Sequence, residues 1–204
     1  MFSWARTRSS DSERQRWVVV DVETTGMDAA TDELISIGGV AMFDGRVIPT
    51  DSIEIIVEKT TPSSRENILL HGIGAQAQLA GTDPHRAMRS FMDFIGQAPL
   101  VAFHARFDRG FLARAIKVYV NLPFDNPWLD LAELAPVLDS KARLKSLDEW
   151  LQRYQIPISA RHNAAADAFA TALLAARLLP EARRQGASDF VSLQRLARYA
   201  RWVY

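Results

Sequence analysis

The sequence predicts an α/β protein in which three antiparallel strands and then parallel strands form one mixed sheet flanked by helices. The first observation is a series of three β-rich runs near the N-terminus, where Asp44-Gly45, a two-residue hairpin signal, joins the second run to the third. The second is that, from residue 82 onward, short apolar runs alternate with segments whose apolar residues recur at helical spacing. This alternation is typical of parallel strands connected by helices.

Each element is predicted from its own residue pattern. Asp83 is a typical N-cap, and Pro84 suits the first helical position after it. Strands are expected in the stretches 17–28, 34–43, 47–58, 99–104 and the start of 128–138. Helices are expected at 82–96, 107–120, the end of 128–138, 144–156, 164–179 and from Ser188 or Asp189 to Tyr204.

The composition indicates a single body with two appended ends. A chain of 204 residues with 48% hydrophobic side chains can bury a full core in one domain. We expect a flexible basic segment at 1–16, the main domain at 17–180 and a helical extension at 181–204. No uncharged run approaches the ~18 residues of a membrane span and the N-terminus has no apolar signal, so we expect a cytoplasmic protein without membrane partners. Because cysteine is absent, any metal must be bound by oxygen or imidazole.

Two carboxylates interrupt the most strand-like segment, WVVVDVETTGMD at 17–28. Asp21 and Glu23 are two residues apart, so they project from the same face of the strand. A buried carboxylate pair needs a cation beside it, either a basic side chain or a metal. The alternative is a pair at a frayed strand end, solvated by water.

Two more acidic residues and a histidine occupy element starts. Asp108 follows Phe107 where a helix begins, and Asp167 lies five residues after His162 in an otherwise apolar helix. Asp108 could simply stabilise the helix dipole, and His162 alone could be a surface histidine. An aspartate in a run of alanines is harder to explain by packing.

Taken together, DVETTG at 21–26, FD at 107–108 and HNAAAD at 162–167 resemble the three motifs of the DEDDh family of 3′–5′ exonucleases. The resemblance covers roughly residues 17–180 and implies a ribonuclease-H-like sheet. It also implies that two divalent cations, Mg²⁺ or Mn²⁺, are bound by Asp21, Glu23, Asp108 and Asp167. His162 would be the general base, on a loop before the helix with Asn163 as a cap.

The resemblance also implies which residues contact the terminal nucleotide. The turn after the first strand would line the pocket, with backbone N–H groups near the 3′-hydroxyl. Phe107 could offer a stacking face to a base, although ordinary core packing is an equal alternative for Phe107 and Met27. The implied contact residues are Thr24, Gly26, Met27, Glu66, His71 and Phe107.

The second motif departs from the family pattern. Members usually have H-N-A-x-F-D, whereas this chain has Phe103 and His104 in the first two positions. The substitutions spare Asp108 but put in doubt what the missing asparagine does around the substrate. His104 could be a metal ligand or a loop histidine with a backbone partner.

The resemblance implies single-stranded 3′ ends as partners, with DNA preferred over RNA, and a DNA polymerase subunit as a further partner. RNA 3′-end trimming and a non-catalytic module that docks on a polymerase remain alternatives. Formal charge is +2 for residues 1–16, −5 for the body and +3 for residues 181–204. Since the negative body does not attract a polyanion, a nucleic-acid partner must be held by local cations.

The last predicted helix offers such cations, and two interpretations of it stay open. Its arginines could contact phosphates, or its apolar stripe could pack on the body and leave the arginines as a solvated face. The apolar positions are Val191, Leu196, Ala200 and Val203. The arginines beside them are Arg195, Arg198 and Arg201.

Overall fold

The computed structural model describes residues 16–142, 144–158 and 161–203, with side chains only up to residue 198 at the C-terminal end. Its five-stranded sheet has the order β3-β2-β1-β4-β5. The first three strands pair antiparallel, and β4 and β5 add to β1 in parallel, which confirms the predicted mixed sheet. The strands are β1 (Arg16–Thr24), β2 (Leu34–Phe43), β3 (Arg46–Ile56), β4 (Leu100–Ala102) and β5 (Trp128–Asp130).

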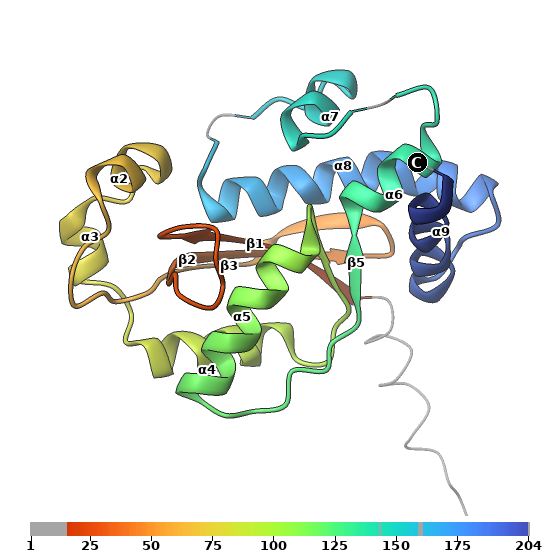
Figure 1. Cartoon of the computed structure of the whole chain (residues 1–204). Helices are drawn as coiled ribbons and strands as arrows, with labels where there is room; N and C mark the ends of the chain where they lie inside the picture. The colour runs from red at the N-terminus through yellow and green to blue at the C-terminus, as the bar shows by residue number, and fades with distance from the viewer. Residues whose placement is uncertain (1–15, 143, 159–160, 204) are drawn as a thin grey trace, which may run out of the picture.

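Helices cover both faces of the sheet. In Figure 1, α7 and α8 lie over one face, α4 and α5 lie over the other, and α9 stands beside β5. None of the described helices is long and apolar enough to cross a membrane. The helices are α2 (Arg65–His71), α3 (Ala75–Leu79), α4 (Pro84–Ile95), α5 (Ala105–Tyr119), α6 (Leu131–Leu138), α7 (Leu147–Arg153), α8 (Ala164–Arg184) and α9 (Phe190–Val203).

Local signals set several of these boundaries. Asp44 and Gly45 both adopt positive φ, 51° and 78°, as a two-residue hairpin turn requires. The Asp83 side chain accepts a hydrogen bond from the backbone N–H of Arg86 at 3.0 Å, and Pro84 begins α4. These short-range predictions are confirmed because each depends on only a few neighbouring residues.

Side chains alternate between the two faces of the sheet along β1, and this places its two carboxylates on the face covered by α8. Val18 and Val20 belong to the core shared with α4 and α5, whereas Val19 belongs to the core shared with α6, α7 and α8. Asp21 and Glu23 have the same parity as Val19 and therefore point to the α8 side of the sheet.

A glycine lets α8 approach that face closely. Gly38 of β2 lies opposite Asp21 in the antiparallel register. A Cβ at position 38 would be 2.1 Å from the backbone carbonyl of Ala164, the first residue of α8. The absent side chain therefore allows the first turn of α8, which carries Asp167, to rest on the sheet.

Three features differ from the sequence-based expectations. Arg16, placed in the flexible segment, is the first residue of β1, while the rest of 1–16 lies outside the described residues. The expected boundary at 180–181 falls inside α8, which continues to Arg184. The short helices α2 and α3 were not predicted.

The apolar stripe of α9 also differs. Leu196 is partly buried and packs on the core as predicted, whereas Val191 is 56% exposed. The buried residues of the helix are Phe190, Leu193 and Ala197. The reason is that α9 packs against α6 and β5, which are remote in sequence and select the buried face. The side chains of Ala200, Arg201 and Val203 lie outside the described residues, as does Tyr204.

Candidate active site

Three of the four predicted carboxylates converge. One oxygen from each of Asp21, Glu23 and Asp167 lies within 4.8 Å of the others. Asp21 and Glu23 come from the end of β1, and Asp167 comes from the first turn of α8. The cluster therefore joins residues far apart in sequence at the carboxyl end of the central strand.

The fourth carboxylate reaches β1 from α5. Asp108 is 2% exposed, and its Oδ1 accepts a hydrogen bond from the backbone N–H of Val22 at 3.1 Å. Burial raises the pKa of Asp108 well above its usual range. Its charge in turn helps to raise the pKa of Asp21, the residue that precedes Val22 in the strand. A simple helix-dipole role does not account for this buried position.

The cluster holds more negative charge than its surroundings balance. Burial, followed by the charges of Asp108, Glu23 and Asp167, raises the pKa of Asp21 well above its usual range. Burial and then Asp167 raise the pKa of Glu23 to about 7. Such shifts indicate that a cation would be favoured here, and an all-oxygen donor set suits Mg²⁺ or Mn²⁺. The residues present thus fit the implied divalent cations.

A cationic side chain already contacts this cluster. Arg161 forms an ion pair through Nη1 with Asp167 and a second through Nε with Asp148 of α7. Its charge lowers the pKa of both Asp21 and Glu23, against the larger raising effect of burial. Sequence reasoning missed Arg161, although a cation directly before the third motif was a visible signal.

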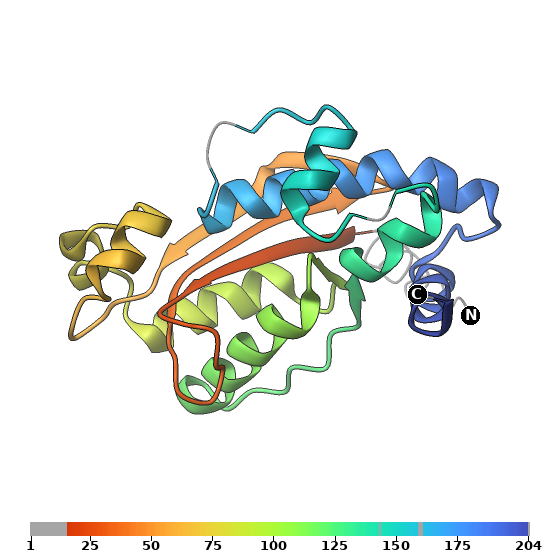
Figure 2. The same cartoon turned by 45° about the horizontal axis from the view of Figure 1, so that its top comes forward.

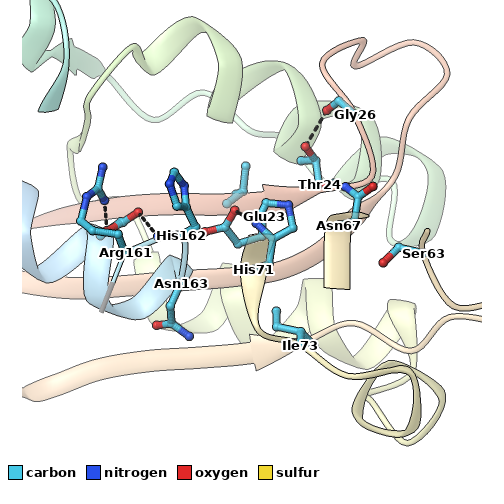
Figure 3. Close-up of polar contacts among 12 residues, drawn as sticks. Glu23, Thr24, Gly26, Ser63, Asn67, His71, Ile73, Arg161, His162 and Asn163 are labelled. Carbon is cyan, nitrogen blue, oxygen red and sulfur yellow. Dashed lines mark hydrogen bonds and ion pairs between the residues drawn. The ribbon is translucent and has the colours of Figure 1, made fainter. Parts of the chain in front are cut away.

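His162 lies on the connection before α8, as predicted. Its φ of 59° is left-handed, its side chain is exposed, and its backbone N–H donates to Oδ2 of Asp167 at 3.1 Å. Asn163 caps α8 by accepting from the N–H of Ala166 at 2.9 Å, which confirms the predicted cap. Figure 3 shows the imidazole of His162 beside Glu23 and His71. The exposed ring thus lies next to the carboxylates at the solvent-facing side of the site.

The unpredicted helix α2 supplies a second histidine. Nδ1 of His71 lies 2.5 Å from Oε2 of Glu23, a pair that Figure 3 shows side by side. Burial and the neighbouring charge of His162 lower the pKa of His71. Asn67, which sequence reasoning missed, donates from Nδ2 to the carbonyl of Thr24 at 3.0 Å. Two side chains of α2 thus contact the end of β1.

Glu66 does not join this group in the structure. It is exposed in the first turn of α2, and hydrogen bonds from its own backbone and from Ser64 lower its pKa. Among the described contacts, none connects Glu66 with the acidic cluster. Its predicted substrate role stays a prediction.

The turn after β1 forms part of a cavity of about 410 Å³. Thr24 donates from Oγ1 to the carbonyl of Gly26 at 2.6 Å, which fixes the turn. A Cβ on Gly26 would lie 2.3 Å from the Asp32 carboxylate, so a larger residue would have to displace that side chain. Met27 is 82% exposed, which rules out core packing for it. The cavity is lined by Met27, Ala29, His104, Arg106, Phe107 and Asp130.

Two further residues of this cavity, Phe107 and His104, are positioned by contacts within the protein. Phe107 is half-buried and packs on Phe111, with ring centroids 4.9 Å apart. His104 begins α5 with a φ of 65°, and its backbone N–H donates to Oδ1 of Asp130 at 3.0 Å. His104 lies outside the three-carboxylate cluster. A backbone partner for its imidazole stays a prediction.

Arg114 of α5 anchors the loop that carries Met27. Its Nη1 donates to the carbonyl oxygens of Ala29 at 2.9 Å and Asp32 at 2.8 Å. Sequence reasoning missed Arg114, because nothing near position 114 indicates a partner more than 80 residues away. The loop is thus fixed on the helix that carries Asp108 and Phe107.

The fold and site define a class of α/β proteins that hold an acidic cluster at the end of a central strand. The chain belongs to the exonuclease family, because the family model RNase T, described as Exonuclease, matches residues 18–175. This confirms the family resemblance of the motifs. The DNA polymerase III PolC-type protein of Listeria monocytogenes is 33% identical over 175 residues, which are 85% of this chain and 12% of that protein.

A further relative supports the family, and solved structures support the fold. The DNA polymerase III subunit epsilon-like protein of Rhodobacter capsulatus is 36% identical over 179 residues, 85% of this chain and 25% of that protein. The chain therefore spans only a small part of these relatives. E. coli Exonuclease I in complex with a dT13 oligonucleotide has a TM-score of 0.72 at 18% identity, covering 84% of this chain and 42% of that one. Cell-death related nuclease 4 has a TM-score of 0.70 at 17% identity, covering 86% and 66%.

Proposed function

We propose that the protein is a DEDDh-type 3′–5′ exonuclease that removes nucleoside monophosphates from single-stranded DNA. The observation that carries the proposal is the convergence of Asp21, Glu23 and Asp167 within 4.8 Å, with buried Asp108 hydrogen-bonded to the backbone of Val22 in the same strand. Membership of the exonuclease family supports the same chemistry. The intact acidic set argues against a non-catalytic module.

In this proposal two Mg²⁺ or Mn²⁺ ions are held by Asp21, Glu23, Asp108 and Asp167. When bound, such ions activate the attacking water and stabilise the charge that develops on the leaving oxygen. The unbalanced charge of the cluster supports this, since burial and Asp167 raise the pKa of Glu23 to about 7 even though the charge of Arg161 lowers it.

His162 is the proposed general base. Its exposed imidazole, on a loop fixed to Asp167 by the backbone, can take a proton from the attacking water and release it to solvent. His71 faces Glu23 from the other side at 2.5 Å and can orient that carboxylate.

The terminal nucleotide would occupy the cavity beside the turn after β1. Met27 and Phe107 would contact the base, and the turn at Thr24 and Gly26 would present its backbone to the sugar. His71 and Glu66 complete the proposed contact set. A base has a π-face whatever its identity, so these contacts suit a strand of any sequence.

DNA is the proposed substrate, and a DNA polymerase subunit is a proposed partner. Support comes from the relatives named DNA polymerase III PolC-type and epsilon-like and from the neighbour that binds dT13. RNA 3′-end trimming is the second candidate, because His104 replaces the asparagine usual at that position and lines the candidate nucleotide cavity.

Product analysis on end-labelled single strands tests the proposal. With Mg²⁺ or Mn²⁺, a 5′-labelled DNA strand should give a ladder that shortens with time, and a 3′-labelled strand should give only mononucleotide. The same assay on RNA decides between the two substrate classes. Internal products from the outset, or release of mononucleotide from the 5′ end, would contradict the proposal.

A further inference from the structure

A second, larger cavity of about 860 Å³ lies along β5 at the edge of the sheet. Its walls come from the first turns of α5, from β5 with the residues before it, and from α9. Figures 1 and 2 both show α9 next to β5. Arg106 and Asp130 line this cavity and also the smaller one that contains Met27 and Phe107. The two cavities therefore adjoin.

Three arginines line the larger cavity. Arg106, Arg109 and Arg198 make no hydrogen bond or ion pair with any other residue whose side chain is described. Arg106 and Arg109 are three residues apart on α5 and thus share a helix face. Arg198 comes from α9 on the opposite wall. Free guanidinium groups that converge on one space are suited to bind phosphates.

The packing of α9 holds Arg198 at this wall. Leu193 and Ala197 are buried against the body, and Gln194 donates from Nε2 to the carbonyl of Trp128 in β5 at 2.8 Å. The two interpretations of this helix are thus compatible, because one face packs on the body while Arg198 lines the cavity.

Three carboxylates also line the cavity, those of Asp125, Asp130 and Glu133. Asp130 is already engaged by the protein. It accepts hydrogen bonds at 3.0 Å from the backbone N–H groups of His104 and Ala132. Asp130 therefore serves to cap α6 and to fix the start of α5. The arginines have no comparable internal role.

We propose that this cavity is a binding subsite for single-stranded DNA, in which Arg106, Arg109 and Arg198 hold the phosphates upstream of the terminal nucleotide. The inference rests on the proposed exonuclease function, which puts the 3′ end in the adjoining smaller cavity. The half-buried Trp128 on the cavity wall offers an aromatic face near the strand. Such local cations are needed because the body of the chain carries a formal charge of −5.

The test uses the double variant Arg109→Gln/Arg198→Gln, which alters only the larger cavity. Binding of a fluorescent oligothymidylate about 12 nucleotides long is measured in EDTA over a range of KCl concentrations. Two lost phosphate contacts should reduce the slope of log K against log salt by about 1.4 and weaken binding at least about ten-fold. The p-nitrophenyl ester of thymidine 5′-monophosphate is too small to reach the larger cavity. Its hydrolysis with Mn²⁺ should therefore stay unchanged in the double variant.

The matched control is Arg89→Gln/Arg195→Gln. It removes the same charge from exposed positions on α4 and α9 that line neither cavity. Equal salt slopes for the two double variants and the wild type would overturn the subsite. If the proposed exonuclease function is wrong, the wild type will hydrolyse neither the ester nor an oligonucleotide. The binding measurement in EDTA does not depend on hydrolysis and still tests the subsite.

Discussion

Arg161 is paired with Asp167, so the acidic cluster has a resident cation of its own. The guanidinium is held on its other side by Asp148 of α7, a helix that is otherwise remote from the site. Only part of the negative charge is offset, since the pKa of Glu23 is still raised to about 7. A divalent ion that binds through Asp167 must therefore compete with Arg161.

Arg161→Gln should tighten Mn²⁺ binding by roughly five-fold. An ion pair worth about 1 kcal/mol no longer has to be broken, and the cluster becomes more negative. Titration calorimetry or the EPR signal of free Mn²⁺ measures this directly. Arg153→Gln on α7 breaks an ion pair with Asp139, the C-cap of α6, and should leave the affinity unchanged. Weaker Mn²⁺ binding in Arg161→Gln alone would refute the competition.

Asp21→Asn should abolish hydrolysis yet stabilise the metal-free protein. The amide keeps the shape but removes a charge that burial and three carboxylates disfavour. We expect activity to fall at least about a thousand-fold, since losing one ligand removes several kcal/mol of metal assistance. The melting temperature in EDTA should rise. Asp93→Asn, at an exposed site on α4, should change neither quantity, and an active Asp21→Asn enzyme would exclude the proposed metal set.

The metal-free protein should lose stability as pH rises from about 4.5 to 7. Glu23 has a pKa of about 7 in the folded chain against 4.5 in its reference state, so the folded state holds more protons in this window. The protonation of Glu23 contributes at most about 3 kcal/mol to the free energy of unfolding. This contribution is fully present below pH 4.5 and is lost above pH 7. Urea unfolding in EDTA at several pH values measures it. Glu23→Gln should flatten the curve across this window, and an unchanged curve would contradict the assignment.

The sequence predicts elements whose signals are local and misses those set by distant partners. The hairpin at Asp44-Gly45 and the start of α4 at Asp83 follow from adjacent residues. The helix α2 has seven residues and buries none of them, so it leaves no apolar periodicity to detect. Its position depends on contacts such as that of Asn67 with Thr24.

The same distinction applies to the site. Asp21, Glu23 and Asp167 could be predicted because motif spacing and family resemblance both mark them. Arg161 and Arg114 could not be assigned a role, because each acts through contacts that only the folded chain creates. The buried face of α9 was predicted only in part for a related reason: Leu196 packs on the core but Val191 does not, since α6 and β5 determine the face.

His162→Ala should lower kcat by roughly 10²–10⁴-fold while Mn²⁺ binding remains, because the carboxylates are untouched. The exposed ring contributes little to the core, so the melting temperature should hardly change. Single-turnover hydrolysis and Mn²⁺ titration give the two quantities. His85→Ala, an exposed histidine on α4, is the control and should behave as wild type. If His162→Ala lost Mn²⁺ as severely as Asp167→Ala, the residue would be a ligand rather than the base.

Gly38→Ala should disrupt the site without altering any residue that contacts substrate or metal. The added Cβ would meet the backbone of Ala164 at 2.1 Å, and backbone cannot yield as a side-chain end can. The first turn of α8 must then move away from the sheet and carry Asp167 away from Asp21. We expect a loss of about 1–3 kcal/mol in unfolding free energy from overpacking, together with weaker Mn²⁺ binding and a lower kcat.

Gly74→Ala is the matched control, since a Cβ there meets nothing within 4 Å, and its unfolding free energy should stay within about 0.5 kcal/mol of wild type. Normal Mn²⁺ affinity in a destabilised Gly38→Ala protein would show that the close approach of α8 serves packing alone and not the position of Asp167.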